Sequence, residues 1–168
     1  MKFFIDTNVL ISYVVETDVN HRQAVKLVNN IKGEKVISDY VILEMACVFS
    51  RILPYMEIPK ELEEIFKTLK PHEKIYLLIE YTLLQTNVSV ECIKEHIESM
   101  HLISKELRTK SIIKLGIYYS NELKLKALDL IHLISAKILG CNKFITFDKE
   151  ILKRKLDIAR VLGIEIVP

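Results

Sequence analysis

Short apolar runs alternate along this chain with longer stretches in which apolar residues recur every three or four positions. The short runs are typical of buried strands and the longer stretches of amphipathic helices. A strand, helices and a second strand in this order predict parallel βαβ units with right-handed crossovers. We therefore predict an α/β fold, Rossmann-like and three-layered, in which helices flank a central parallel sheet of four or five strands. The strands are expected at residues 2–5, 35–37, 143–146 and 164–167.

The middle of the chain, from residue 53 to about residue 107, has a helical pattern and few residues suited to catalysis. Pro59 and Pro71 each stand at the predicted start of a helix, where proline is well tolerated. Ser89 is placed to cap a third helix, although residues 88–90 fit a short strand equally well. We predict one domain over residues 1–168, with this helical segment inserted in it or extending it.

Two acidic residues stand directly after predicted strands. Asp6 ends the first strand, and Asp148 follows the strand at residues 143–146 in the same way. The carboxyl ends of parallel strands converge on one crevice, which is where ligands bind in open α/β sheets. Acidic residues also commonly cap helices. For Asp6 taken alone, a helix cap and a ligand are equally good interpretations.

Two further acidic residues belong to predicted helices that face the core. Glu44 lies along the edge of the apolar stripe of a helix that begins near Ser38 and reaches Ile52. Asp129 lies in the almost wholly apolar stretch at residues 127–136, and His132 shares its helix face. The alternatives are a surface position for Glu44, and for Asp129 either an ion pair with His132 or a helix N-cap.

Folding a parallel sheet can bring Asp6, Glu44, Asp129 and Asp148 to one crevice. Four carboxylates cannot sit together in ionised form without cations, because their mutual repulsion raises some of their pKa values. Ligands that are all oxygen atoms favour Mg²⁺ or Mn²⁺ over zinc. Such a site suits phosphodiester hydrolysis, in which one or two ions activate a water and neutralise the leaving oxygen. Asn8 and Thr146 are placed to orient these carboxylates or a bound water.

Four segments together carry a family resemblance. They are Ile5-Asp6-Thr7-Asn8-Val9-Leu10, the helix that bears Glu44, Ala127-Leu128-Asp129-Leu130-Ile131-His132-Leu133, and Ile145-Thr146-Phe147-Asp148. In this order they resemble the PIN-domain nucleases, and in particular the small prokaryotic VapC-type toxins. The resemblance covers residues 1–52 and about 123–168, whereas the middle departs from the family pattern in being longer.

The resemblance implies a PIN-like fold and a metal-dependent ribonuclease, often dimeric and held inactive by a cognate antitoxin. It further implies that the four acidic residues form the metal site and that Asn8 and Thr146 support it. RNA is held mainly through its phosphates, so we expect a basic cluster beside Asp148 to bind the RNA. This cluster consists of Lys149, Lys153, Arg154 and Lys155, on a short helix expected at residues 149–156. Alternatively, it is a solvated helix face whose cations favour the helix C-terminus.

The composition adds limits on location and partners. The net charge of +2 is too small to identify a nucleic-acid binder. The three scattered cysteines suggest neither zinc nor disulfides, and they are expected to be small core residues. The apolar runs are too short to cross a bilayer and the N-terminus lacks signal-peptide features, so a cytoplasmic protein without a membrane partner is expected. Half of the residues are apolar, which favours a symmetric homodimer.

Three functions from different classes fit these observations. The favoured one is a toxin-type endoribonuclease that acts on RNA with Mg²⁺ or Mn²⁺. The second is a housekeeping RNA-processing nuclease that uses the same site, and the third is a non-catalytic RNA-binding or assembly module in which the acidic residues pair with lysines. A neighbouring gene for an antitoxin distinguishes the first from the second, and metal titration separates both from the third.

Overall fold

The computed structural model describes residues 1–93 and 111–168 of the chain. Five parallel strands form one sheet in the order β3-β2-β1-β4-β5. Their bounds are Lys2–Ile5 (β1), Glu34–Ser38 (β2), Ser89–Glu91 (β3), Lys143–Ile145 (β4) and Glu165–Val167 (β5). The prediction of an α/β fold with a parallel sheet of four or five strands is confirmed. The undecided segment near Val88 contributes the fifth strand, β3.

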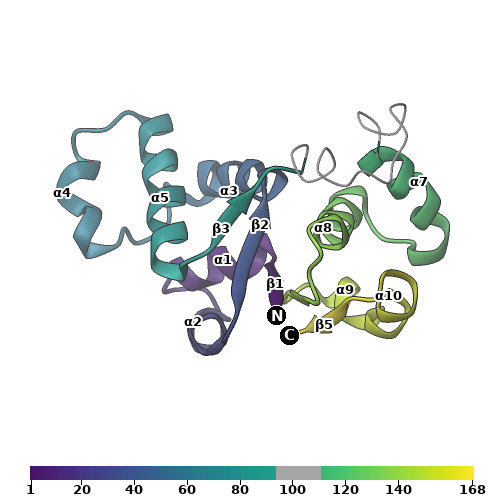
Figure 1. Ribbon diagram of the computed structural model, residues 1–168. Helices are drawn as coiled ribbons and strands as arrows, with labels where there is room; N and C mark the ends of the chain where they lie inside the picture. The colour runs from purple at the N-terminus through teal and green to yellow at the C-terminus, as the bar shows by residue number, and fades with distance from the viewer. Residues whose placement is uncertain (94–110) are drawn as a thin grey trace.

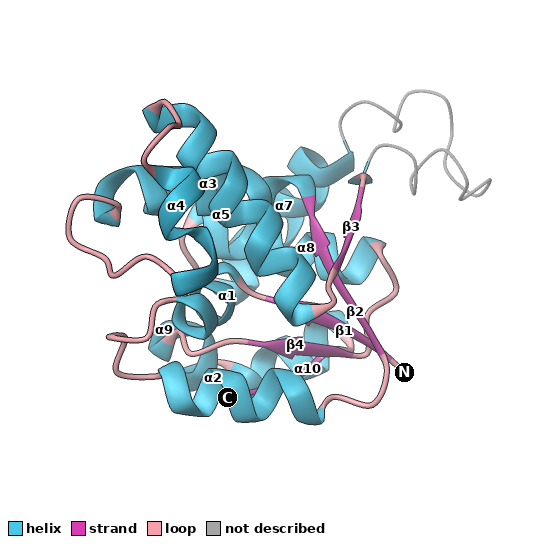
Figure 2. Cartoon of the chain, turned by 90° about the vertical axis from the view of Figure 1, so that its left-hand side faces the viewer, coloured by secondary structure: helices cyan, strands magenta, loops and turns pink. Residues whose placement is uncertain are grey.

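Helices cover both faces of this sheet. Figure 1 shows one group on one side, formed by α1 (Thr7–Val14), α2 (His21–Asn30), α3 (Asp39–Ile52) and α5 (Pro71–Thr86). The group on the other side consists of α7 (Ser111–Leu123), α8 (Ala127–Ile138) and α10 (Lys155–Leu162). Shorter elements are the 3-10 turn η1 (Lys60–Leu62), α4 (Glu63–Phe66) and α9 (Lys149–Lys153). The expected three layers are therefore present, and Figure 2 looks onto the sheet from the side of α4 and α5.

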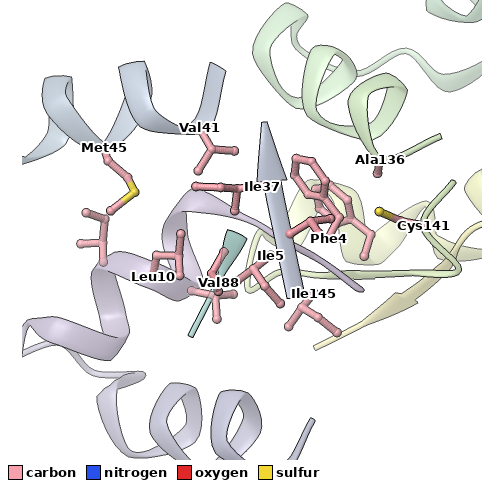
Figure 3. Close-up of a cluster of buried hydrophobic side chains, with 14 of the residues drawn as sticks. Phe4, Ile5, Leu10, Ile37, Val41, Met45, Val88, Ala136, Cys141 and Ile145 are labelled. Atoms are coloured by element: carbon pink, nitrogen blue, oxygen red, sulfur yellow. The ribbon is translucent and has the colours of Figure 1, made fainter. Parts of the chain in front are cut away.

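The core lies where the central strands meet α1, α3 and α8. Phe4 pairs in register with Val36 on β2 and Phe144 on β4, and its ring stacks on that of Phe144 at 5.2 Å between centroids. Figure 3 shows Ile37, Met45 and other side chains that close around these strands. Strands covered on both faces bury side chains on each face, which explains why β1 and β4 are apolar after their first lysine. The central strands therefore form a rigid base that fixes the positions of the residues at their carboxyl ends.

Several expected elements differ in the structure. The helix expected from Pro59 shortens to η1 and α4, and the expected helical segment at residues 53–107 is interrupted by β3. Residues 94–110 lie outside the described part, and with them the rest of the third middle helix. The single helix expected at residues 149–156 is split in two at Arg154, whose backbone leaves the helical region. Gly33 follows the end of α2, and a side chain there would collide with the Met1 carbonyl oxygen.

None of the described helices is long and apolar enough to span a membrane. The three cysteines are free, as expected, but only Cys141 is buried, because Cys47 lies on the exposed face of α3. The interpretation of all three as core residues is therefore wrong for Cys47.

Candidate functional site

All four acidic residues singled out in the sequence line one open cleft of about 540 Å³. The cleft lies beyond the carboxyl ends of β1 and β4. Side chains from α1, α3, α8 and α9 form its walls. The sheet topology explains this convergence, because residues that follow neighbouring parallel strands leave the sheet at the same edge.

Asp6 caps a helix and also lines the cleft. Its Oδ1 accepts the backbone N–H of Thr7 at 2.9 Å and so caps α1. Its Oδ2 accepts hydrogen bonds from Asn8 Nδ2 at 2.8 Å and from Thr146 Oγ1 at 2.6 Å. Burial is the main reason that the pKa of Asp6 rises to about 6, and the Glu44 carboxylate adds to the rise, against the lowering effects of His132 and Thr146. The two interpretations of Asp6, cap and site residue, are thus compatible.

Asn8 and Thr146 join the tips of β1 and β4 beside Asp6. The Asn8 amide also donates to Thr146 Oγ1 at 3.1 Å, and its Oδ1 accepts the backbone N–H of Phe147 at 3.0 Å. Thr146 is fully buried, and its hydroxyl oxygen accepts the backbone N–H of Asp148 at 2.9 Å. Both side chains therefore lie where the sequence predicted them. Their support of a bound metal stays a prediction.

Asp148 repeats at β4 the arrangement that Asp6 shows at β1. It is the N-cap of α9, where its Oδ1 accepts the backbone N–H groups of Glu150 at 2.7 Å and Ile151 at 3.2 Å. Both capping bonds use the same oxygen. The cap therefore holds the carboxylate at the edge of the cleft while Oδ2 takes no part in capping.

Glu44 is held by two donors from other helices. Its Oε2 accepts hydrogen bonds from Thr7 Oγ1 on α1 and from His132 Nε2 on α8, the latter at 2.8 Å. Its side chain is 26% exposed, on the side that faces the cleft. Partial burial tends to raise the pKa of Glu44, but the hydrogen bonds from His132 and Thr7 outweigh it and lower the pKa. Glu44 is thus an ionised carboxylate, and it does not extend into solvent as the alternative required.

Asp129 is the third residue of α8, and the N-cap of that helix is Lys126. The N-cap interpretation of Asp129 is therefore wrong, because the helix begins three residues earlier than a cap at this position allows. Among the described residues, its buried Oδ2 has no hydrogen-bond partner. Burial and, next, the Asp148 carboxylate raise the pKa of Asp129. The expected alternative of an Asp129–His132 pair is replaced by the bond of His132 Nε2 to Glu44.

The donor set fits a divalent cation. Four carboxylates share one cleft, two of them have raised pKa values, and the Asp129 oxygen without a partner is an acceptor that a cation would satisfy. Oxygen-rich sets of this kind suit Mg²⁺ or Mn²⁺. One ligand atom from each of Asp6, Glu44 and His132 lies within 4.8 Å of the others. The part that His132 plays in this group is considered below.

Two residues of the site were not identified from the sequence. Thr7 was only part of a helix start, and His132 was considered only as a possible partner of Asp129 one turn earlier. Both donate to Glu44, which is 37 and 88 residues away along the chain, respectively. No local pattern reveals a bond over such a separation, so this contact needed the fold.

The basic cluster is divided in the structure. Lys149 lines the cleft, whereas Lys153 is exposed and pairs with Glu150 one turn earlier on α9 at 2.7 Å. Arg154 stands at the break between α9 and α10, and Lys155 begins the second of these helices. The four cations therefore do not share one helix face. Lys149 is the member best placed to meet a ligand in the cleft.

Three comparisons bear on this architecture. The family model described as PIN domain matches residues 3–156, and no curated protein matches the chain. A chain of VapBC2 from Rickettsia felis, crystallised with a DNA fragment from its promoter, is 13% identical with a TM-score of 0.57, over 99% of this chain and 98% of that one. VapC20 of Mycobacterium tuberculosis, a toxin that cleaves the sarcin-ricin loop, is 14% identical with a TM-score of 0.58, over 90% and 93%. At such identities the likeness is one of fold.

Proposed function

The chain belongs to the PIN domain family, and from that premise we propose that it is a metal-dependent endoribonuclease that hydrolyses RNA phosphodiester bonds. The observation that carries this proposal is the convergence of Asp6, Glu44, Asp129 and Asp148 on one cleft. A binding module has no need to bring four carboxylates together at such electrostatic cost. The raised pKa values of Asp6 and Asp129 are a measure of that cost.

These four residues would hold Mg²⁺ or Mn²⁺. When bound, the ion lowers the barrier to phosphodiester hydrolysis by acidifying a water and neutralising charge on the phosphate oxygens. The residues of the chain prepare this site. Thr146 and Asn8 fix the Oδ2 side of Asp6, and the start of α9 fixes Asp148. Lys149 lies at the cleft edge, where it can contact an RNA phosphate.

The chain is further proposed to be the toxin of a toxin–antitoxin pair. In support, its fold resembles that of VapC20, which is a toxin that cleaves RNA of the sarcin-ricin loop, and that of a chain of the VapBC2 complex. The partners under this proposal are RNA, a cognate antitoxin protein and a second copy of the chain. A housekeeping RNA-processing nuclease is the competing outcome, and the genetic test below separates the two.

The nuclease proposal is tested with purified protein and a mixed pool of end-labelled RNA. We expect cleavage in Mn²⁺ or Mg²⁺, none in EDTA, and a loss of more than about 100-fold in the Asp6→Asn variant, which exceeds the loss typical of residues that only support a metal ligand. The Asp157→Asn variant is the matched control, because it makes the same chemical change at a carboxylate that lies outside the cleft lining and pairs on the surface with Arg160. Equal cleavage by the Asp6→Asn variant and the unmodified chain would contradict the proposal.

The toxin proposal is tested by expression in a bacterial host. Induction of the unmodified chain is expected to arrest growth and the Asp6→Asn variant to be harmless. A small open reading frame found beside the gene is expected to restore growth when it is co-expressed. Active protein that cleaves RNA in vitro but leaves growth unchanged would favour the housekeeping nuclease. Size-exclusion chromatography at micromolar concentration tests the predicted homodimer.

A further inference from the structure

Glu44 receives both of its hydrogen bonds on a single oxygen. Thr7 Oγ1 and His132 Nε2 reach Oε2 from α1 and α8, whereas Glu44 itself belongs to α3. We propose that Thr7 and His132 are positioning residues that clamp Oε2 of Glu44 and so direct Oε1 to a divalent cation in the cleft. This inference rests on the proposed function, because the clamp has a purpose only at a metal site.

The hydrogen-bonding chemistry of His132 identifies it as a donor. An ionised carboxylate only accepts hydrogen bonds, so the bond at 2.8 Å places a ring proton on Nε2. The other ring nitrogen, Nδ1, is buried and has no partner among the described residues. In the neutral ring, the proton on Nε2 leaves Nδ1 as an acceptor with a lone pair. A buried acceptor without a partner costs less free energy than a buried N–H donor without one.

The same observation argues against His132 as a metal ligand. A histidine that binds a metal through Nε2 carries its proton on Nδ1, and that N–H almost always donates to a carboxylate, a carbonyl or a water. The described residues offer Nδ1 no such acceptor. Although atoms of Asp6, Glu44 and His132 lie within 4.8 Å of one another, His132 fits as a donor to a ligand and not as a ligand itself.

The surrounding core holds the side chains of the two donors, Thr7 and His132, but it does not hold the side chain of the acceptor, Glu44, in the same way. Thr7 is 4% exposed and His132 is 2% exposed, so the surrounding core fixes both side chains. A glutamate has several rotatable bonds, and ordering it costs conformational entropy unless the protein does so beforehand. Hydrogen bonds to a charged carboxylate are also stronger than neutral ones. The clamp therefore preforms one wall of the site before an ion enters.

The test measures Mn²⁺ affinity by electron paramagnetic resonance of the free ion, in the full chain and without RNA. The Thr7→Val and His132→Leu variants remove one donor each, and we expect each to weaken binding about 10- to 100-fold. The Thr7→Ser and His132→Gln variants keep a donor near the same place and are expected to restore most of the affinity. If Thr7 and His132 had a structural role alone, the Mn²⁺ affinity would not differ in this way between the variant that removes a donor and the variant that keeps one.

Two further measurements make the outcome decisive. In a Glu44→Gln background, Thr7→Val is expected to cost little more, because both changes act through one carboxylate. Pulsed resonance of the Mn²⁺-loaded chain is expected to show no nitrogen in direct contact with the ion. A directly coordinated nitrogen, or unchanged affinity in the Thr7→Val variant, overturns the clamp and leaves the nuclease proposal standing. An unmodified chain that binds no Mn²⁺ overturns the nuclease proposal, and the clamp falls with it.

Discussion

The acidic residues of the cleft fall into two pairs that are held in different ways. The strand-tip acids, Asp6 and Asp148, follow β1 and β4 and are fixed by backbone N–H groups at the start of a helix. The helix acids, Glu44 and Asp129, lie within α3 and α8, and neither accepts such a bond from the described part of the chain. Glu44 depends on two side chains, and Asp129 has a buried oxygen without a partner in the described residues.

This difference shows which carboxylates are held by the fold itself and which need an ion to balance their charge. A strand tip followed by a helix gives a carboxylate two functions, because one oxygen caps the helix and the other remains available to the cleft. Glu44, in the interior of α3, has no backbone donors in reach, since these are used within the helix, and its charge is balanced by side chains. Asp129 lies in the first turn of α8, but its buried Oδ2 has no partner among the described residues, and we propose that a cation balances its charge.

The largest expected effect concerns Asp6, because burial raises its pKa by more than its hydrogen bonds lower it. Burial raises its pKa from the usual 3.8 to about 6. Between these values the folded chain binds the proton more tightly than the unfolded chain does. The stability that this proton provides is therefore complete below pH 3.8 and is lost as the pH rises through 6. Over this window the loss is about 3 kcal/mol in metal-free protein.

Urea unfolding in EDTA at several values between pH 4 and pH 7 checks this expectation. The unmodified chain is compared with the Asp6→Asn variant, in which residue 6 does not titrate. We expect the free energy of unfolding of the unmodified chain to fall relative to that of the variant as the pH rises. Two curves that stay parallel would contradict this expectation, and would show that the hydrogen bonds at the strand tip satisfy the Asp6 charge without an ion.

The two pairs also differ in how far the sequence could predict them. Asp6 and Asp148 were visible because each ends an apolar run that only a buried parallel strand explains, and the sheet order β2-β1-β4 brings their tips together. Glu44 and Asp129 were recognised as conspicuous, but not their partners. The bond of Glu44 to His132 depends on how α3 packs against α8, which the pattern of a single helix does not encode. The break at Arg154 was missed for a similar reason, since the apolar period continues through it.

The second effect concerns the cap formed by Asp148. Replacing Asp148 by alanine removes the side-chain acceptor for two backbone N–H groups, and we expect a loss of about 1 kcal/mol in the free energy of unfolding without metal. The Asp148→Asn variant keeps a capping oxygen and is expected to retain stability while it loses Mn²⁺ affinity. Thermal unfolding in EDTA and Mn²⁺ titration measure the two properties separately. Equal stability of the two variants would mean that the cap does not hold this strand-tip acid.

The smallest expected effect on stability has the opposite sign and concerns Asp129. Burial and the nearby Asp148 carboxylate raise its pKa, so its charge opposes folding above the usual range of the group. The Asp129→Asn variant, which carries no charge there, should therefore melt at a slightly higher temperature than the unmodified chain in EDTA at pH 7.5. Saturating Mn²⁺ should reverse this order, because an ion that binds only the folded chain stabilises it by an amount that rises with the logarithm of its affinity. A variant that stays more stable in Mn²⁺ as well would mean that Asp129 contributes nothing to the ion, and the unpartnered oxygen on α8 would need another ligand.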